Sequence, residues 1–296
     1  MSTGGMDEET AAKQFGRDAT LAISHSGFRR VAEFVTAELG IRMSPAKIPL
    51  IQSRLQRRLR VLGCESLEKY IDTVLTSPAG DGEILEFIDA ITTNKTDFFR
   101  EPQHFDYLVG TALPALDPDP GQPWEAHVWS AGCSSGQEVY TLGMVLAEYA
   151  GIRQGFDHRI LGTDISGHVL RAAQEAIYDA ALIEPVPQAL RRKYLLRSRD
   201  PARTLVRIAP EIRSRVRFMR LNFMASAYDV RDTFDVIFFR NVMIYFDKPT
   251  QEKVVHRMCE RLRPGGYLFV GHSESLTGIS APVQCVAPAV YRKPGN

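Results

Sequence analysis

The sequence has few cysteines and no long apolar run, and both absences exclude classes of protein. Its four cysteines lie far apart and form no C-x-x-C pair: Cys64, Cys133, Cys259 and Cys285. We therefore expect reduced thiols, a cytoplasmic protein, no structural zinc site and no bound metal. No apolar run approaches the ~20 residues of a membrane-spanning helix, so we expect no membrane insertion.

An excess of charge of one sign is also lacking. The formal net charge is +1 over 296 residues, which argues against a general binder of polyanions, and no nucleic-acid partner is expected. The chain is long enough for two domains with a large core. Its first thirteen residues are small and polar and contain no apolar signal-peptide run, so we expect residues 1–24 to form a disordered tail.

Residues 25–92 predict a small all-helical domain without a convincing strand. Apolar residues recur at helical spacing in its first helix, at Phe28, Val31, Val35 and Leu39. Similar patterns predict three more helices, near residues 45–62, 67–75 and 84–91. The helix near residues 45–62 carries Arg54, Arg57 and Arg58 on one face, because positions three and four apart are neighbours on a helix. A solvated face is the ordinary explanation of such a cluster.

Residues 124–296 alternate strands with helices, after a linker and connecting helix at 93–123. Strands are expected near residues 127–131, 159–163, 216–221, 234–239, 267–271 and 289–292. Helices are expected near residues 137–149, 169–176 and 250–262. This alternation predicts an α/β fold with a doubly wound parallel sheet covered on both faces. The alternating run Thr204–Ile208 interrupts it and predicts a small inserted antiparallel β subdomain at about 190–215.

A glycine-rich turn between a strand and a helix, Val128–Glu138, predicts a nucleotide pocket. Its small residues would let the backbone approach a ligand, and Asp164, at the end of the next strand, could take both hydroxyls of a ribose. The spacing is not G-x-G-x-x-G, and Asp164 lies 28 positions after Gly136. The pattern therefore favours an adenosyl group over a dinucleotide and speaks against a nicotinamide dehydrogenase. A turn that needs glycine for geometry alone is the alternative.

Polar side chains follow another expected strand, Phe234–Phe239. Arg240, Asn241 and Tyr245 come directly after it, and ligands of open α/β sheets bind outside the carboxyl ends of the strands. These three residues are therefore candidates for a site, with a solvated loop as the alternative. The segment Ile91–Glu101 is also dense in hydrogen-bonding side chains, although a helix cap and hinge would explain it nearly as well.

Four short runs occur in order along the chain, and their combination is far more specific than any one of them: Thr92–Glu101, Ser135–Tyr140, Phe239–Phe246 and Gly271–Glu274. Together they resemble the chemotaxis-receptor glutamate methyltransferases, the CheR family, over about residues 28–292. The resemblance implies S-adenosylmethionine (SAM) as cofactor, S-adenosylhomocysteine as product, and methyl esters on glutamate side chains of chemotaxis receptors. Alternatives are a nucleic-acid methyltransferase, which the sequence disfavours because it has no Asn-Pro-Pro-Tyr or Asp-Pro-Pro-Tyr segment, and a non-catalytic SAM-binding signalling module.

The resemblance also implies site residues. The SAM-binding positions are Asn94, Thr96, Arg100, Glu138, Asp164, Asn222, Phe223, Arg240 and Asn241. Arg100 and Tyr245 are the expected catalytic residues, of which Arg100 could hold a carboxylate and Tyr245 lies near the transferred methyl. The loop departs from the family pattern at Gln137 and Val139, so the acidic role in it rests on Glu138 alone.

The resemblance further implies contacts with the cytoplasmic domains of receptors. The basic face of Arg54, Arg57 and Arg58 would dock on acidic methylation helices. A receptor C-terminal tail could add a strand to the β subdomain, with the run Thr204–Ile208 as its expected partner. His272 and Ser273 could reach the site, but a supporting or structural role is the stronger interpretation.

Overall fold

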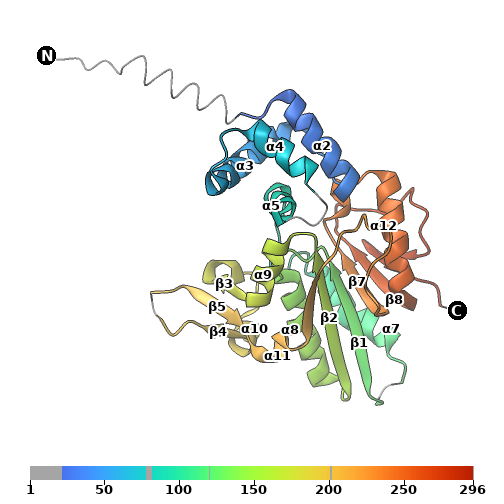
Figure 1. Cartoon of the computed structure of the whole chain (residues 1–296). Coiled ribbons are helices and arrows are strands. Elements are labelled where there is room, and N and C mark those ends of the chain that lie inside the picture. Colours follow the sequence, from blue (N-terminus) through green and yellow to red (C-terminus); the bar gives the residue numbers. More distant parts are fainter. Residues whose placement is uncertain (1–21, 78–81, 120, 201, 296) are drawn as a thin grey trace, which may run out of the picture. The chain divides into compact units, whose positions relative to one another are not determined.

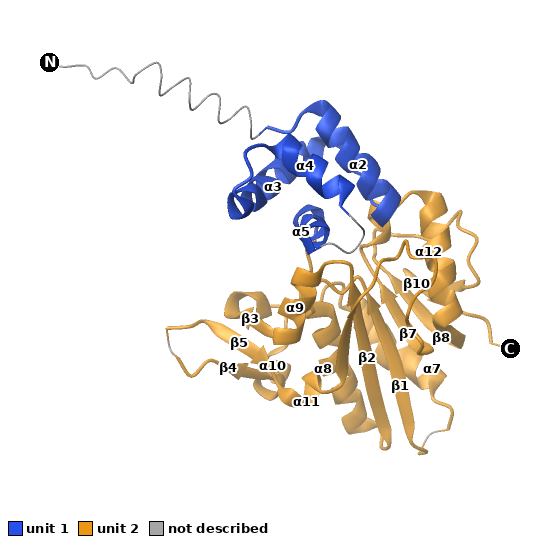
Figure 2. Cartoon of the chain, viewed as in Figure 1, with its two compact units in different colours: residues 1–93 blue, residues 94–296 orange. Residues whose placement is uncertain are grey.

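The computed structural model describes residues 22–77, 82–119, 121–200 and 202–295. The chain divides into two compact units, residues 1–93 and residues 94–296 (Figures 1 and 2). Most of the expected tail at 1–24 lies outside the described residues, and Ser24 caps the first described helix by accepting a hydrogen bond from the Gly27 N–H at 2.9 Å.

Among its described residues, unit 1 contains helices and no strand, as predicted. Its elements are α2 (His25–Leu39), the 3-10 turn η1 (Pro45–Lys47), α3 (Ile48–Leu62), α4 (Leu67–Thr76) and α5 (Gly82–Ile91). Gly40 and Gly63 end α2 and α3 in the left-handed region, with φ of 70° and 63°. The apolar stripes meet in a core where Val31, Leu55 and Phe87 are fully buried.

Unit 2 is built on a seven-stranded sheet in the order β6-β2-β1-β7-β8-β10-β9 (Figure 1). Its strands are β1 (Trp124–Ala131), β2 (Phe156–Asp164), β6 (Val216–Arg220), β7 (Phe234–Phe239), β8 (Leu262–Val270), β9 (Gln284–Ala287) and β10 (Val290–Arg292). The first five are parallel to one another, which confirms the predicted doubly wound sheet. β10 is antiparallel to both β8 and β9, and β9 is a strand that the sequence did not predict.

Helices cover both faces of this sheet. Successive residues of β1 point to opposite faces: Val128 packs with Leu142 and Leu146 of α8 (Gln137–Ile152), whereas the Trp129 ring lies against Tyr228 and Phe234. The helix α12 (Lys248–Arg261) covers the face toward which Trp129 points, because Arg257 of this helix lies over the Tyr228 ring. α9 (Gly167–Glu175) follows β2.

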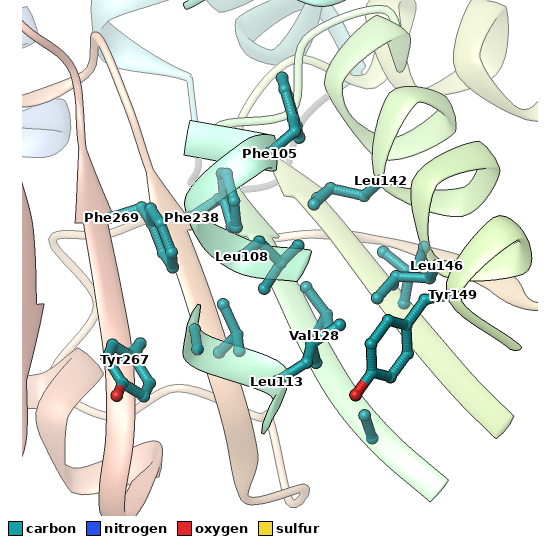
Figure 3. Packing of buried hydrophobic residues seen from close by; sticks show 14 of the residues in the cluster. Phe105, Leu108, Leu113, Val128, Leu142, Leu146, Tyr149, Phe238, Tyr267 and Phe269 are labelled. Atoms are coloured by element: carbon teal, nitrogen blue, oxygen red, sulfur yellow. The ribbon is translucent and has the colours of Figure 1, made fainter. Parts of the chain in front are cut away.

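A broken helical segment packs beside α8 on the first face. It comprises α6 (Gln103–Tyr107), the π-helical turn η2 (Leu108–Ala112) and α7 (Leu113–Leu116). Figure 3 shows Phe105, Leu108 and Leu113 directed onto the sheet between α8 and the β7–β8 pair. The Phe238 ring stacks on Phe269 with centroids 4.4 Å apart and on Phe105 at 5.8 Å. This packing fixes α6 over β7 and β8.

The predicted antiparallel insert is a three-stranded sheet in the order β3-β5-β4. Its strands are β3 (Ile177–Asp179), β4 (Leu195–Arg197) and β5 (Leu205–Ile208), flanked by η3 (Ala180–Ile183), α10 (Gln188–Tyr194) and α11 (Pro210–Arg213). β3 comes from before the expected start at about 190. The expectation that the run Thr204–Ile208 offers a free edge is wrong, because β5 is the central strand and pairs on both sides. The outer strands are β3 and β4.

Candidate active site

The carboxyl ends of five parallel strands lie at one edge of the large sheet. From β1 the chain continues to β2 and β6, which lie on one side of β1 in the sheet, and it then crosses to β7 and β8 on the other side of β1. The strand order therefore reverses between β1 and β7, the position where open α/β sheets bind ligands. Every site residue predicted in unit 2 after residue 131 lies at or shortly after one of these strand ends, or in the first turn of the helix that follows β1.

The turn after β1 is held tightly by its glycines. Gly132 and Gly136 have φ of 82° and 92°, in the left-handed region. A Cβ on Gly132 would lie 2.4 Å from Val242 Cγ2, and one on Gly136 would lie 2.9 Å from Ala173 Cβ. The alternative interpretation, glycine for geometry, therefore holds for both positions. It does not exclude a pocket, because the same geometry leaves the backbone of the turn without side chains at these two points.

Asp164 lies at the end of β2 and ties this turn to the next helix. Its side chain is buried, and Oδ2 accepts a hydrogen bond from the Ser134 N–H at 2.9 Å while Oδ1 accepts one from Ser166 N–H at 3.0 Å. The carboxylate therefore holds the turn after β1 next to the start of α9, at the position predicted for the ribose.

Asn222 and Phe223 lie beside Asp164, because Leu221 N–H donates to the Asp164 carbonyl at 2.9 Å. The Asn222 side chain accepts a hydrogen bond from Met224 N–H at 2.9 Å and is half-buried. The Phe223 ring is buried against Phe239, with centroids 5.3 Å apart.

The linker Asn94–Glu101 runs along the glycine turn and α8. The Asn94 carbonyl accepts a hydrogen bond from Ser134 Oγ at 2.8 Å, and Phe99 N–H donates to Thr141 Oγ1 at 3.1 Å. Asn94, Thr96 and Arg100 are each half-buried. The segment thus brings three predicted ligand residues to the turn after β1.

Arg240 joins this linker to α8. Its side chain is 2% exposed, with Nη1 3.1 Å from Glu138 Oε2 and Nη2 3.0 Å from Glu101 Oε2. The Arg100 carbonyl also accepts from Nη2, and Ser130 Oγ donates to Glu138 Oε1 at 2.7 Å. The guanidinium therefore donates these N–H groups to acceptors within the protein and fixes the positions of two carboxylates.

The pKa values of the two carboxylates around Arg240 shift in opposite directions. Burial raises the pKa of Glu138, although the Arg240 charge and the Ser130 hydrogen bond oppose this change. Burial also acts to raise the pKa of Glu101, but the charge and hydrogen bond of Arg240 outweigh it and hold that pKa below its usual value. Glu101 was not among the residues assigned from the sequence, although it ends one of the runs that carry the resemblance.

Asn241 lies in a strained turn that a buried carboxylate braces. Its φ is 60°, and its N–H donates to Glu274 Oε2 at 2.8 Å. Gly271 N–H donates to the same oxygen at 2.7 Å, and Ile244 N–H donates to Oε1 at 3.2 Å. Burial raises the pKa of Glu274 in spite of these hydrogen bonds. The run Gly271–Glu274 was recognised in the sequence, but the bracing role of Glu274 was not.

Tyr245, at the end of η4 (Met243–Tyr245), is half-buried and close to Arg100. Burial raises the pKa of the Tyr245 hydroxyl, and the charge of Arg100 opposes the change. The two expected catalytic residues are thus within electrostatic reach of each other. The hydroxyl is protonated at neutral pH and can donate a hydrogen bond.

The predicted basic face lies in unit 1, where two of its arginines have partners. Arg54 Nη1 donates to the Thr92 carbonyl at 2.7 Å, and Arg58 pairs with Glu83, with Nε 2.8 Å from Oε1. The Arg57 side chain is exposed and has no ion pair among the described residues. In the described parts of the chain, no helix is long and apolar enough to cross a membrane.

Two family models match consecutive parts of the chain. The one described as CheR methyltransferase, all-alpha domain, matches residues 26–92, and the one described as CheR methyltransferase, SAM binding domain, matches residues 94–291. A chemotaxis protein methyltransferase of Klebsiella aerogenes is 36% identical over 290 residues, 98% of this chain and 96% of the relative. One from Borreliella burgdorferi is 38% identical over 274 residues, 92% of this chain and 95% of the relative. The chain therefore belongs to the CheR methyltransferase family.

Proposed function

We propose that this chain transfers a methyl group from SAM to glutamate side-chain carboxylates of chemotaxis receptors. The observation that carries the proposal is the match of the SAM-binding family model to residues 94–291, the span that contains the strand-end site. The product would be a glutamate methyl ester, which is neutral where the acceptor was an anion. Such a change would serve sensory adaptation in the cytoplasm, where the receptors present their signalling domains.

The residues at the strand ends suit SAM. The turn after β1 has no Cβ at Gly132 and Gly136, and the buried Asp164 carboxylate lies at the end of β2 beside this turn, where it can accept hydrogen bonds from ribose hydroxyls. The half-buried side chains of Asn94 and Arg100 offer polar groups to the amino-acid part of SAM. SAM bound there supplies a methyl group made electrophilic by its sulfonium charge.

The acceptor needs no general base, since a free glutamate has a pKa near ~4.3 and is an anion at neutral pH. This fits the site, where Glu101 and Glu138 are engaged by Arg240 rather than free to take a proton. The chain then has mainly to position two reactants, and orientation can supply roughly 7–11 kcal/mol in favourable cases. We assign Arg100 to hold a carboxylate through paired N–H groups and Tyr245 to orient the acceptor through its O–H.

Receptor contacts form the second part of the proposal. The exposed Arg57 would dock on acidic methylation helices, while Arg54 and Arg58 would contribute less because each already has a partner in unit 1. A receptor tail would add a strand to β3 or β4, the outer strands of the small sheet. Leu196 of β4 is 50% exposed and offers an apolar contact to such a strand.

The test is methyl transfer from labelled SAM to membranes that carry the host's chemoreceptors, followed by alkali. Carboxyl esters release their label as volatile methanol, whereas N-methyl groups do not. We expect alkali-labile label on the receptor band, and none with Arg100→Ala. Binding of SAM without labile label would contradict the proposed acceptor, and label on co-purified RNA or DNA would identify a different substrate class.

A further inference from the structure

A cluster of three potential metal ligands adjoins the strand-end site. Glu101 precedes α6, His104 lies in α6 and His272 follows β8. One ligand atom of each residue lies within 4.8 Å of those of the others. His104 Nδ1 is 3.5 Å from Glu101 Oε2, and the two imidazole centroids are 4.7 Å apart. Two imidazoles and a carboxylate are thus gathered from two segments that are far apart in the sequence.

His104 is the unusual member of this cluster. Its side chain is only 2% exposed, and neither ring nitrogen has a hydrogen-bond partner among the described residues. Burying polar atoms without a partner costs free energy, so native proteins rarely leave both nitrogens of an imidazole unsatisfied. The ring is held in place by its edge contact with Phe269, at 5.6 Å between centroids. Nδ1 therefore stays directed at the cluster without forming a hydrogen bond there.

We propose that Glu101, His104 and His272 form a binding site for Zn²⁺. Two histidines and one glutamate are a known donor set for zinc, with the fourth position left to water or another ligand. His104 would bind through Nδ1, the ring nitrogen 3.5 Å from Glu101 Oε2, because a neutral imidazole has a lone pair on one of its two nitrogens. The exposed His272 gives the ion a route from solvent to the buried ring.

The positive charge of the nearby Arg240 limits the affinity of this site for Zn²⁺. Arg240 Nη2 lies 3.0 Å from Glu101 Oε2, and its positive charge opposes a dication. Glu138, 3.1 Å from Arg240 Nη1, offsets part of this charge. Glu101 Oε2, the oxygen 3.5 Å from His104 Nδ1, also accepts a hydrogen bond from His272 N–H at 3.2 Å, so the ion would share this carboxylate with Arg240. An occupied site would therefore fix the carboxylate that positions Arg240, next to the SAM-binding positions.

The test is isothermal titration of Zn²⁺ into the full chain without a histidine tag, together with the absorption spectrum of bound Co²⁺. We expect one Zn²⁺ per chain, and visible Co²⁺ bands typical of four or five ligands. His272→Ala removes an exposed ligand with little risk to the fold, and we expect it to weaken binding by at least about tenfold. His25→Ala, which removes an exposed imidazole of unit 1, is the matched control and should leave the affinity unchanged.

Three results would overturn the proposal: no Zn²⁺ binding, binding that His272→Ala leaves unchanged, or equal weakening by His25→Ala. Glu101→Gln provides a second check, since it should also weaken binding, and circular dichroism verifies that this variant folds. Because these readouts need no methyl acceptor, they separate the zinc site from the proposed methyl transfer.

Discussion

Arg240 Nη1 lies 3.1 Å from Glu138 Oε2, so the residue that follows β7 is paired with the first turn of the helix that follows β1. The same guanidinium holds Glu101 of the linker at 3.0 Å. One buried cation thus joins three segments of the strand-end site, and the ion pairs fix the positions of their backbones. This arrangement makes Arg240 both a structural residue and a neighbour of the expected SAM-binding positions.

We expect Arg240→Met to lower the free energy of unfolding by about 3–5 kcal/mol, because it leaves two largely buried carboxylates without their cation. Urea unfolding followed by tryptophan fluorescence measures this loss in unit 2, since both tryptophans, Trp124 and Trp129, lie in β1. Arg217→Met is the control. Its partner is Asp232 in an exposed ion pair, so it should cost less than about 1 kcal/mol. Equal losses in the two variants would contradict the role given to Arg240.

Asp164→Asn should weaken binding of S-adenosylhomocysteine by about 10- to 100-fold, the equivalent of one or two hydrogen bonds to a charged group. Isothermal titration measures the affinity. Asp179→Asn is the control, since Asp179 is an exposed residue that caps η3 in the small sheet region. An affinity that Asp164→Asn leaves unchanged would exclude the ribose contact.

Tyr245→Phe should lower the turnover number by about 10- to 100-fold at saturating SAM, because the acceptor carboxylate loses the group that orients it. The affinity for S-adenosylhomocysteine should stay the same. Labelled methyl transfer to receptor membranes measures turnover, and titration measures the affinity. Unchanged turnover would remove Tyr245 from the mechanism, whereas a parallel loss of affinity would make it a cofactor contact.

Gly132→Ala should reduce both stability and cofactor affinity. Its φ of 82° is strained for alanine, and the added Cβ would lie 2.4 Å from Val242 Cγ2. We expect a loss of about 1–3 kcal/mol in the free energy of unfolding. Adding Val242→Ala should recover part of this loss, because it removes the clash but not the backbone strain. Full recovery would show that the positive φ contributes nothing to the loss in the free energy of unfolding. No recovery would show that the added Cβ does not clash with Val242.

His158 should make the protein less stable in mild acid. It is buried in β2 with no hydrogen-bond partner for either ring nitrogen among the described residues. Burial lowers its pKa from 6.5 to about 4. The folded state thus favours the neutral ring, and the stabilisation present above pH 6.5 is lost as the pH falls toward 4, by up to about 1.4 kcal/mol per pH unit.

The measurement is the free energy of unfolding from pH 7 to pH 4.5, by urea titration at each pH. His158→Phe keeps a ring beside Phe156, with which His158 is stacked, but cannot be protonated. The variant should lose less stability than the parent chain over this range. Curves of equal slope would mean that His158 does not titrate in this window.

The architecture followed from the sequence where local patterns were long. Helical spacing over Phe28–Leu39 and strand–helix alternation after residue 124 are signals of one element at a time, and the structure has those elements. β3 and β4 are three residues each, too short for any periodicity, and the exposed pattern of β9 gives no alternation. Which strand of the insert would be central depends on pairing, which no local pattern encodes.

The sequence by itself determined the family, the two-unit organisation expected from it and the positions expected to bind SAM, because short runs of residue types carry that information in order. Only the tertiary structure decided what those residues touch. Glu101 meets Arg240 across 139 positions, and Glu274 braces Asn241 across 33. The cluster of Glu101, His104 and His272 likewise exists only because the packing of α6 on Phe238 and Phe269 brings the linker to the end of β8. Contacts between distant segments arise from sheet order and side-chain packing, which a linear pattern does not contain.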